Sequence, residues 1–328
     1  MSRRALVTGV GGFTGRRLAE RLLADGWDVS GTVHSRPSGI EGVQEHRCDV
    51  ADWAEVRRVV AESRPDVVFH LAAIVDTVTT PDLSALYRTN TLGTAAVLDA
   101  VGKAGDVARV VLASSAFAYG RFDGPGAVVG EDTPLAPVTP YGASKAAAEV
   151  IALQWSRQHA TDVVVARGFQ HTGPGHVGRY ALADWARQLA EGADRLEVGD
   201  LSPVRDYLDV RDVAGAYVAL AESGRAGRAY NVASGIPRSM RDMLDGLVTA
   251  FGREVEVAVA PDRLRAVDQP VFVADVERLH EDTGWVPAYG VEETLRDLAD
   301  FATESARAAG EDDARSAGFT PFERRTRG

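Results

Sequence analysis

A chain of 328 residues is long enough for one large α/β domain with an appended lobe, or for two domains. Hydrophobic residues make up 45% of it and charged residues 25%, as in ordinary soluble proteins, and no apolar run approaches the roughly 18 residues of a membrane helix. The net charge of −11 argues against nucleic acid and anionic membranes as partners, because both favour a basic surface. The single cysteine, Cys48, excludes an intramolecular disulfide and a cysteine-rich metal site, and we predict no metal. Residues 1–10 lead into a strand without a signal-peptide pattern, so we expect a cytoplasmic protein.

A glycine-rich turn lies near the start of the chain. The segment 4–8 is typical of a buried parallel strand and 16–24 of a helix, and the glycines between them follow the spacing GxxGxxG. Such glycines let the phosphates of a dinucleotide approach backbone N–H groups at a helix N-terminus. The residues of this turn that we expect to contact a cofactor are Gly9, Gly12, Phe13, Thr14 and Gly15.

Strands and helices then alternate, which implies a doubly wound parallel (Rossmann) sheet in an α/β fold. The strand-like runs are 28–33, 67–72, 109–113 and 163–166, and the helical patterns are 54–62, 91–104 and 144–159. After about residue 170 the order loosens, with helical patterns at 179–192, 240–251 and 291–305. We therefore assign residues 1–168 to a cofactor-binding domain and 169–305 mainly to a smaller C-terminal substrate lobe. We expect this lobe to close over the carboxyl edge of the sheet, the chain crossing back to the sheet, and 306–328 to be a mobile tail.

The end of the second predicted strand bears on the choice of cofactor. An NAD site usually has a carboxylate there, which bonds the adenosine ribose and repels a 2′-phosphate. The sequence from Gly31 to Arg36 contains no acid, and the Arg36 guanidinium, assisted by Ser35 and His34, suits a phosphate. We therefore predict that NADP(H) is favoured over NAD(H).

Two later segments complete the predicted cofactor site. Asp49, which precedes Val50 after a third predicted strand, can accept a hydrogen bond from the adenine amino group, or it can be the N-cap of the next helix. Leu71, Ala72 and Ala73 end the following strand with small residues that leave room for the ribose on the nicotinamide side.

Tyr141 and Lys145 stand four residues apart and share one face of a predicted helix. A free tyrosine titrates near 10, and a neighbouring ammonium lowers that value toward the working pH. Tyr141 can then give or take a proton while hydride moves to or from the substrate carbon, and a serine at the end of the strand before it can bond the same oxygen. We assign that serine as Ser115, although Ser114 could share its role.

At these residues the chain resembles the extended short-chain dehydrogenase/reductases that act on nucleotide sugars as epimerases, dehydratases and ketoreductases. The resemblance covers roughly residues 3–302 and includes 70–73, 114–120, 140–145, 167–175 and 205–213. The segments 198–201, 230–235 and 262–271 are similar to those of the GDP-4-keto-6-deoxy-mannose reductases.

The resemblance implies a nucleoside-diphosphate sugar as substrate, with Arg205 and Arg265 near its diphosphate. An acidic protein needs such local cations for an anionic substrate. The resemblance also implies a homodimer formed through the helices 91–104 and 144–159. The predicted substrate contacts are Ser115, Ala116, Phe117, Gln170, Arg205, Arg265 and Asp268.

Three positions depart from the family pattern. The related dehydratases have an Asp-Glu pair where this chain has Ala116 and Phe117, so a dehydration would lack its acid and base. The ketoreductases often keep a glutamate at the position of Phe117, so contacts to the hexose can differ. Gln170 replaces the usual asparagine and adds a methylene where the sugar diphosphate is expected.

Three functional hypotheses follow. The first is an NADPH-dependent reductase of the 4-keto group of a nucleoside-diphosphate 4-keto-6-deoxyhexose. The second is a 4-epimerase with tightly held NAD. The absence of an acid at the end of the second predicted strand argues against it. The third is a sensor that binds NADP without turnover, against which the intact Ser115, Tyr141 and Lys145 speak.

Overall fold

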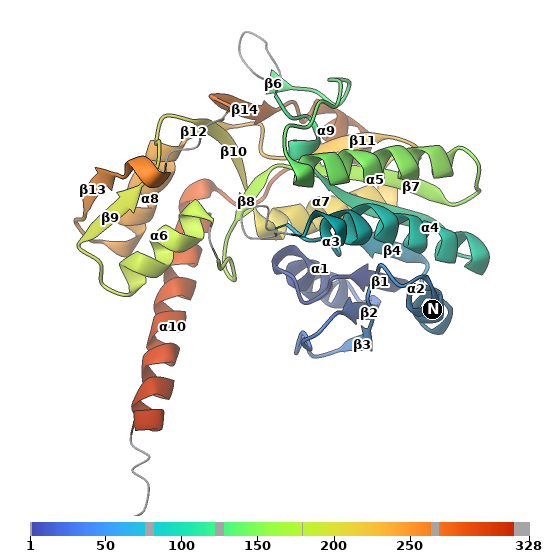
Figure 1. The fold of residues 1–328 in the computed structure, drawn as a ribbon, viewed down its shortest axis with the longest axis horizontal. Coiled ribbons are helices and arrows are strands. Elements are labelled where there is room, and N and C mark those ends of the chain that lie inside the picture. The colour runs from blue at the N-terminus through green and yellow to red at the C-terminus, as the bar shows by residue number, and fades with distance from the viewer. Residues whose placement is uncertain (1, 76–81, 122–127, 179, 264–268, 318–328) are drawn as a thin grey trace, which may run out of the picture. The chain divides into compact units, whose positions relative to one another are not determined.

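The computed structural model describes residues 2–75, 82–121, 128–178, 180–263 and 269–317 (Figure 1). The chain forms two compact units. Unit 1 comprises residues 1–171, 202–239 and 267–291, and unit 2 comprises residues 172–201, 240–266 and 292–328. The predicted domain bounds, and the predicted closing of the lobe over the sheet, stay predictions. Among the described residues, no helix combines the length and apolar character needed to cross a bilayer.

The centre of unit 1 is a seven-stranded sheet in which all neighbouring strands are parallel, as the sequence predicts. Its order is β11 (Ala229–Val232), β7 (Asp162–Gly168), β5 (Arg109–Ser115), β4 (Val67–His70), β1 (Arg4–Thr8), β2 (Asp28–Val33) and β3 (Val43–Arg47). The order reverses between β1 and β4, where Thr8 lies beside His70. In open α/β sheets this switch point, at the carboxyl ends of the strands, is where ligands bind.

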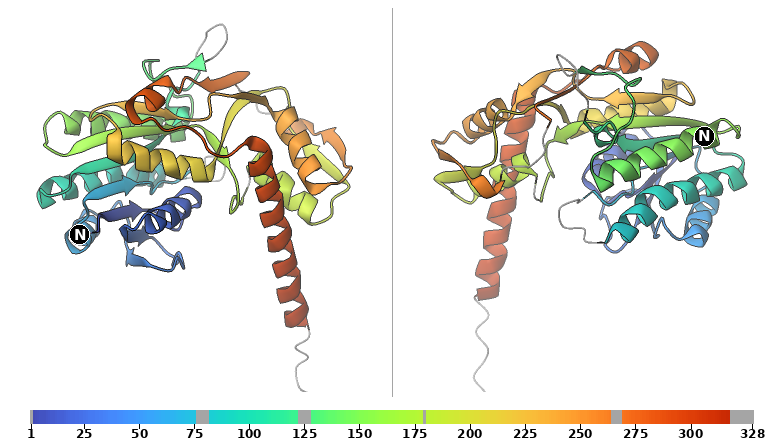
Figure 2. Two further views of the ribbon diagram at one scale, coloured as in Figure 1. Left: turned by 180° about the vertical axis from the view of Figure 1, so that it is seen from behind. Right: turned by 45° about the horizontal axis from the view of Figure 1, so that its top comes forward.

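Helices cover both faces of this sheet (Figures 1 and 2). One face carries α1 (Phe13–Ala24), α7 (Val210–Ser223) and α9 (Glu277–Thr283), which bury Leu18, Leu22, Val213 and Leu279 with residues of β1 and β7. The other carries α2 (Trp53–Ser63), α4 (Gly93–Ala104) and α5 (Pro140–Ser156), which bury Val56, Val97 and Ala148 with residues of β5. With both faces covered, the strands can be almost wholly apolar, as parallel strands usually are.

A second sheet of unit 1 has the order β12 (Pro237–Ser239), β10 (Val204–Asp209), β14 (Val271–Ala274) and β6 (Val128–Val129), and β8 (Gln170–Thr172) also pairs with β10. Asp206 of β10 is buried and holds the turn after β11. Its carboxylate accepts from the Ser234 amide and hydroxyl at 2.8 and 2.6 Å and from the Gly235 amide at 2.9 Å. The acid of the Arg205-Asp206 motif is therefore structural.

Unit 2 contains α6 (Ala181–Ala190), β9 (Arg195–Val198), α8 (Met240–Phe251), the short helix η3 (Pro261–Arg263), β13 (Glu256–Val259) and α10 (Val291–Ala317). The strands β9 and β13 pair in parallel. The helix predicted over 291–305 is the first part of α10, which continues into the segment that we predicted to be a tail. Residues 306–317 contain one glycine and no proline, so helix propensity alone does not end it.

Several helix boundaries differ from the sequence prediction, and two of these differences have a local cause. Helix α5 begins at Pro140 rather than at 144, because the Thr139 hydroxyl accepts from the Gly142 amide and the proline occupies the first turn. The segment predicted as one helix over 91–104 begins as α3 (Leu83–Tyr87) and a π-helical turn, η1 (Arg88–Leu92), before α4. In that turn the Asn90 side chain bonds the backbone of Ile74 on both its N–H and its C=O.

A chain of buried hydrogen bonds crosses the switch point of the sheet. The Thr8 hydroxyl oxygen accepts from the Leu71 and Ala72 amides, both at 3.1 Å, so its proton goes to His70 Nδ1 at 2.7 Å. His70 Nε2 then donates to the Thr94 hydroxyl at 3.2 Å, which donates to the Asn90 carbonyl. Both ring nitrogens of the neutral imidazole are thus hydrogen-bonded. Burial lowers the pKa of His70 to about 3.

Acidification should therefore destabilise the fold through His70. The unfolded chain takes up a proton on this histidine below about pH 6.5, whereas the folded chain does not until about pH 3, so stability falls as the pH falls through this window. Between pH 6 and 4 this amounts to about 2 kcal/mol of unfolding free energy. Urea unfolding of wild type and of His70→Gln at several pH values measures the difference in slope. His280→Gln, at an exposed histidine, is the control, and an equal slope in all three proteins would contradict the assignment.

Candidate active site

The glycine turn packs its backbone tightly between β1 and α1. Gly9 has a φ of 71°, and a Cβ on it would lie 2.9 Å from the Cα of Ala72. A Cβ on Gly15 would overlap the carbonyl oxygen of Gly9, and one on Gly12 would lie 3.2 Å from that same oxygen. Larger residues would therefore displace the backbone that leads to the first turn of α1. This is the cradle that a bound pyrophosphate needs.

The segment after β7 is attached to this turn, which the sequence did not reveal. His171 stacks on Phe13 with ring centroids 5.8 Å apart, and its Nε2 lies 2.9 Å from the Thr14 hydroxyl. His171 Nδ1 bonds the Phe169 carbonyl, so Nδ1 carries the hydrogen and Thr14 donates to Nε2. Burial lowers the pKa of His171, which agrees with this neutral form. Phe13 and Thr14 are thus fixed by a residue more than 150 positions later in the chain.

The loop after β2 is held by two side chains. The Glu45 carboxylate of β3 accepts from the Ser38 amide at 2.9 Å, from the Ser38 hydroxyl and from the Gly39 amide at 3.2 Å. Arg16 of α1 donates to the Ser38 carbonyl. Glu45 is an acid close to the second strand that the local sequence did not show, and its Oε1 accepts all three of these bonds. Arg36 in this loop is exposed, and no hydrogen bond or ion pair joins it to another residue in the described part of the chain.

Asp49 is not the N-cap of the helix that follows it, which corrects one of the two roles considered for it. The N-cap of α2 is Asp52, whose side chain accepts from the Ala54 and Glu55 amides at 2.8 and 3.1 Å. The Asp49 carboxylate instead closes a local turn by accepting from the Ala51 amide at 2.9 Å. The other role of Asp49, at the adenine, stays a prediction. Val50 beside it is buried and packs against α4.

Helix α5 places the tyrosine and lysine of the YxxxK motif one turn apart on the face toward β5. Tyr141 is half-buried in the first turn. Lys145 is 5% exposed, and its ammonium donates to the Ala113 carbonyl of β5 at 2.8 Å. Burial lowers the pKa of Lys145 to about 8, although the Glu149 carboxylate acts in the opposite direction. Asn90 supports the same helix, because its side-chain amide donates to the Ser144 hydroxyl at 2.9 Å.

The two serines at the end of β5 have different partners. The Ser114 hydroxyl donates to the buried Glu149 carboxylate, which commits it to the interior. The Ser115 hydroxyl is the N-cap of the short helix η2 (Ala116–Ala118), where it accepts from the Phe117 amide at 3.2 Å. This difference favours Ser115 over Ser114 as the serine that faces a substrate.

Ala116 and Phe117 are neighbours in η2, but their side chains lie in different surroundings. The Phe117 ring is 42% exposed and contacts the Tyr141 ring edge to face, with centroids 6.0 Å apart. Ala116 is buried in a core cluster with Tyr119 and Phe169. The structure therefore brings Phe117, and not the Ala116 side chain, next to the tyrosine.

The predicted substrate residues are only partly described. Gln170 of β8 is half-buried, and its side-chain oxygen is buried without a hydrogen-bond partner among the described residues. Arg205 of β10 is buried, and its guanidinium donates to the carbonyls of Val204 and Gln269 at 2.8 and 2.7 Å. Arg265 and Asp268 lie outside the described residues, so their convergence with Arg205 stays a prediction.

A family comparison agrees with this geometry. Residues 5–233 match the model of the NAD dependent epimerase/dehydratase family. The chain belongs to this family. It is therefore an NAD(P)-dependent enzyme of oxidoreductase type, as the resemblance of its motifs implies.

Relatives within the family carry different activities in their names. The chain is 34% identical to GDP-6-deoxy-D-mannose reductase of Pseudomonas aeruginosa, over 90% of this chain and 96% of that protein. It is 30% identical to UDP-glucose 4-epimerase of Mycolicibacterium smegmatis, over 91% and 98%. The structure of RMD from Pseudomonas aeruginosa complexed with NADPH matches with a TM-score of 0.80 and 31% identity, over 92% and 99%. The chain thus lies in a family of nucleotide-sugar reductases, epimerases and dehydratases.

The Gly15 contact gives a test of the cradle. Gly15→Ala should force the turn away from the Gly9 carbonyl at a cost of about 1–3 kcal/mol, which would weaken NADPH binding roughly ten- to hundredfold. Gly11→Ala is the matched control in the same turn, since a Cβ there would lie an ordinary 3.7 Å from its nearest neighbour. Titration of intrinsic fluorescence with NADPH measures both. Equal affinities of the two variants would show that the turn does not hold the phosphates.

Proposed function

We propose that the protein reduces the 4-keto group of a nucleoside-diphosphate 4-keto-6-deoxyhexose with NADPH. The observation that carries the proposal is the placement of Tyr141 and Lys145 on the face of α5 toward the end of β5, with Ser115 there free of the Glu149 contact that Ser114 makes. The similarity to GDP-6-deoxy-D-mannose reductase along nearly the whole chain supports it.

The residues of unit 1 supply the proton side of this reaction. The nicotinamide, when bound, supplies the hydride to the carbonyl carbon. Tyr141 donates its phenolic proton to the carbonyl oxygen, and the Ser115 hydroxyl holds that oxygen by a hydrogen bond. Lys145 is anchored on the Ala113 carbonyl, and its charge stabilises the phenolate that Tyr141 becomes. The buried amide network of Asn90 and Ser144 fixes the backbone between these two residues.

Arg36 and its loop support NADPH rather than NADH as the cofactor. The loop is fixed by Glu45 and Arg16, whereas the Arg36 side chain is exposed and has no partner in the described part of the chain. A fixed loop with an available guanidinium suits the 2′-phosphate.

The predicted substrate residues do not include the acid and base that a dehydration needs. One of their polar atoms has no hydrogen-bond partner among the described residues. Phe117 places a phenyl ring beside Tyr141 where a dehydratase would need a carboxyl group. The buried oxygen of Gln170 needs a donor, which a sugar hydroxyl can provide. We keep Arg205, Arg265 and Asp268 as the proposed contacts to the diphosphate end of the substrate. A cytoplasmic location also stays a prediction.

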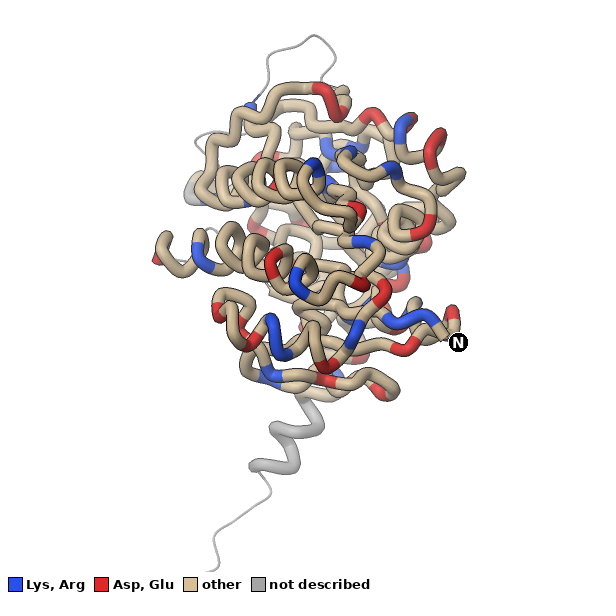
Figure 3. The backbone as a smooth tube through the Cα atoms, turned by 90° about the vertical axis from the view of Figure 1, so that its right-hand side faces the viewer, with Lys and Arg blue, Asp and Glu red and all other residues tan. Residues whose placement is uncertain are grey.

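The face formed by α4 and α5 supports a homodimer. Leu92, which ends η1 directly before α4, is 50% exposed and Val150 of α5 is 64% exposed. Between α2, α4 and α5 lies a groove lined by Trp53, Leu98 and Trp155. Exposed apolar surface of this kind marks a protein interface. Basic and acidic positions are interspersed over the face of the molecule that Figure 3 shows, so that face offers no basic tract for nucleic acid.

Activity assays of Tyr141→Phe test the proposal. The wild type should oxidise NADPH when a nucleoside-diphosphate 4-keto-6-deoxyhexose is added, and Tyr141→Phe should lower turnover by a factor on the order of 10² to 10⁴ while binding NADPH normally. Tyr87→Phe, at an exposed tyrosine of α3, is the control. Turnover of Tyr141→Phe close to that of wild type would remove this residue from the mechanism.

The epimerase alternative has its own signature. A 4-epimerase would retain NAD through purification, and the absorbance of the cofactor released on denaturation would reveal it. Interconversion of a 4-hydroxy sugar nucleotide without net NADPH consumption would replace the proposed reduction by this alternative.

Arg36→Ala tests the cofactor choice. The variant should lose about 1.5–3 kcal/mol of NADPH binding, or roughly ten- to hundredfold in affinity, because a charge-assisted bond to the 2′-phosphate disappears. NADH, which has no such phosphate, should bind as before. Arg296→Ala, at an exposed arginine of α10, is the control. An equal loss of NADPH and NADH affinity would show that Arg36 does not discriminate between them.

A further inference from the structure

The chain contains only two lysines, Lys103 and Lys145, among 36 basic Lys and Arg residues. Lys103 is an exposed residue of α4 that pairs with Asp99 one turn before it, at 2.9 Å. Lys145 is nearly buried in the candidate active site, where burial disfavours its charged form. The proposed proton transfer needs this ammonium charged, so some group must oppose the cost of its burial.

Glu149 lies one helical turn after Lys145 on the same face of α5. Tyr141, Lys145 and Glu149 are thus spaced four residues apart in a row that faces β5. Glu149 is 1% exposed. The Ser114 hydroxyl of β5 donates to its Oε1, and Lys145 donates to the carbonyl of Ala113, the residue before Ser114.

Arg167 of β7 fixes this carboxylate. Its Nη2 donates to Glu149 Oε2 at 2.8 Å and its Nε donates to Oε2 at 3.0 Å and Oε1 at 3.2 Å, which makes a forked ion pair with the side chains 6% and 1% exposed. Its Nη1 donates to the Tyr119 hydroxyl and to the Glu131 carbonyl, both at 2.9 Å. All three nitrogens of the guanidinium are therefore hydrogen-bonded, and two of them hold the Glu149 carboxylate in its position.

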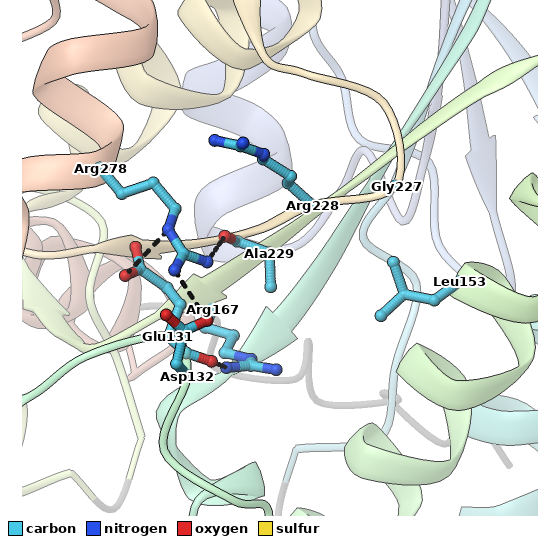
Figure 4. A pocket seen from close by; sticks show the side chains of 8 residues that line it. All are labelled: Glu131, Asp132, Leu153, Arg167, Gly227, Arg228, Ala229 and Arg278. Atoms are coloured by element: carbon cyan, nitrogen blue, oxygen red, sulfur yellow. Dashed lines mark hydrogen bonds and ion pairs between the residues drawn. The ribbon is translucent and has the colours of Figure 1, made fainter.

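Arg167 also forms part of the wall of a cavity of about 480 Å³ in unit 1. Figure 4 shows this cavity, with Arg278 reaching Glu131 and Asp132 across from Arg167. Arg278 pairs with Asp132 at 2.8 Å. The positive charges of the cavity are thus matched by carboxylates, and the cavity does not include the predicted cofactor or catalytic residues.

Among the described residues around Lys145 and Glu149, the other titratable groups place no second negative charge beside Lys145. His70 of β4 is neutral, because both of its nitrogens are occupied in that form. Tyr141 of the same helix and Tyr217 of α7 are phenols, and burial raises the pKa of Tyr217. Tyr119 bonds Arg167, and burial raises its pKa to about 12. Glu131 bonds the Asn231 amide and faces Arg278.

We propose that Glu149 is a positioning residue of the proposed reductase: its carboxylate, fixed by Arg167 and Ser114 one turn from Lys145, keeps the Lys145 ammonium charged beside Tyr141. This inference rests on the proposed function for its catalytic meaning, but the charge of Lys145 can be measured without any substrate. Glu149 and Lys145 need not touch for this effect, because opposite charges on side chains one helical turn apart in a protein interior interact strongly.

The two lysines make a direct measurement possible. Full-length protein labelled with ¹³C at the lysine ε-carbon gives two signals, which Lys103→Arg assigns. Titration of wild type should show a midpoint for Lys145 near pH 8. In Glu149→Gln that midpoint should fall by about one to two pH units, the size expected for losing a charge at this separation. The Lys103 signal should keep the same midpoint in wild type and in Glu149→Gln.

Arg167→Gln is the matched control. It breaks the same ion pair and so has a similar effect on packing, but it keeps the carboxylate, and the Lys145 midpoint should stay at the wild-type value or rise. If either single variant fails to fold, the double variant Glu149→Gln/Arg167→Gln removes both members of the ion pair together, and it should show the lowered Lys145 midpoint. An unchanged Lys145 midpoint in folded Glu149→Gln, or in the double variant, would overturn the proposal.

The pH profile of the reaction provides the second readout. In Glu149→Gln the alkaline limb of kcat/KM should move to lower pH by as many units as the Lys145 midpoint, while activity at pH values below both midpoints stays near that of wild type. A loss of equal size at every pH would mean that Glu149 acts through packing alone and would overturn the proposal. If the midpoint shifts but no sugar nucleotide is reduced, the proposed function fails and the Glu149 effect stands.

Discussion

The structure of unit 1 depends on the Thr8 hydroxyl at the end of β1. This hydroxyl accepts hydrogen bonds from two backbone amides of the segment after β4 and donates one to His70. It thereby connects the two strands between which the sheet order reverses. The neighbouring Gly9 can then approach Ala72 to a distance that no side chain would permit. The crevice at the switch point, the glycine turn and the first turn of α1 all take their positions from this junction, and the predicted cofactor site is built on them.

The sequence predicts the repeating part of this fold well. The strands 4–8 and 28–33 have the predicted bounds, because short β-branched segments beside glycine turns are a local signal. The start of α5 was placed four residues late, since the Thr139 cap and Pro140 outweigh the apolar pattern that begins after them. The N-cap considered as one of two roles for Asp49 belongs to Asp52, because acids three residues apart offer the same signal. The roles of His171 and Glu149 could not be predicted, since each depends on a partner far away in the sequence or on another strand.

Family membership fixes the class of chemistry but not the substrate. The glycine turn and the Tyr/Lys pair are common to reductases, epimerases and dehydratases, whereas the residues around the substrate carbon differ between them. In this chain the Phe117 ring lies against Tyr141, and the buried side-chain oxygen of Gln170 has no hydrogen-bond partner among the described residues.

The scarcity of lysine has a practical consequence for work on this protein. Lys145 is buried and Lys103 is exposed, and the other basic residues of this type are arginines. An amine-reactive reagent at moderate pH therefore has one accessible side-chain amine to modify. Lys103 also lines the groove of α4 and α5 that contains Trp155. A fluorophore attached there without any engineered cysteine would sit beside an indole, and its emission would report on whatever covers that groove.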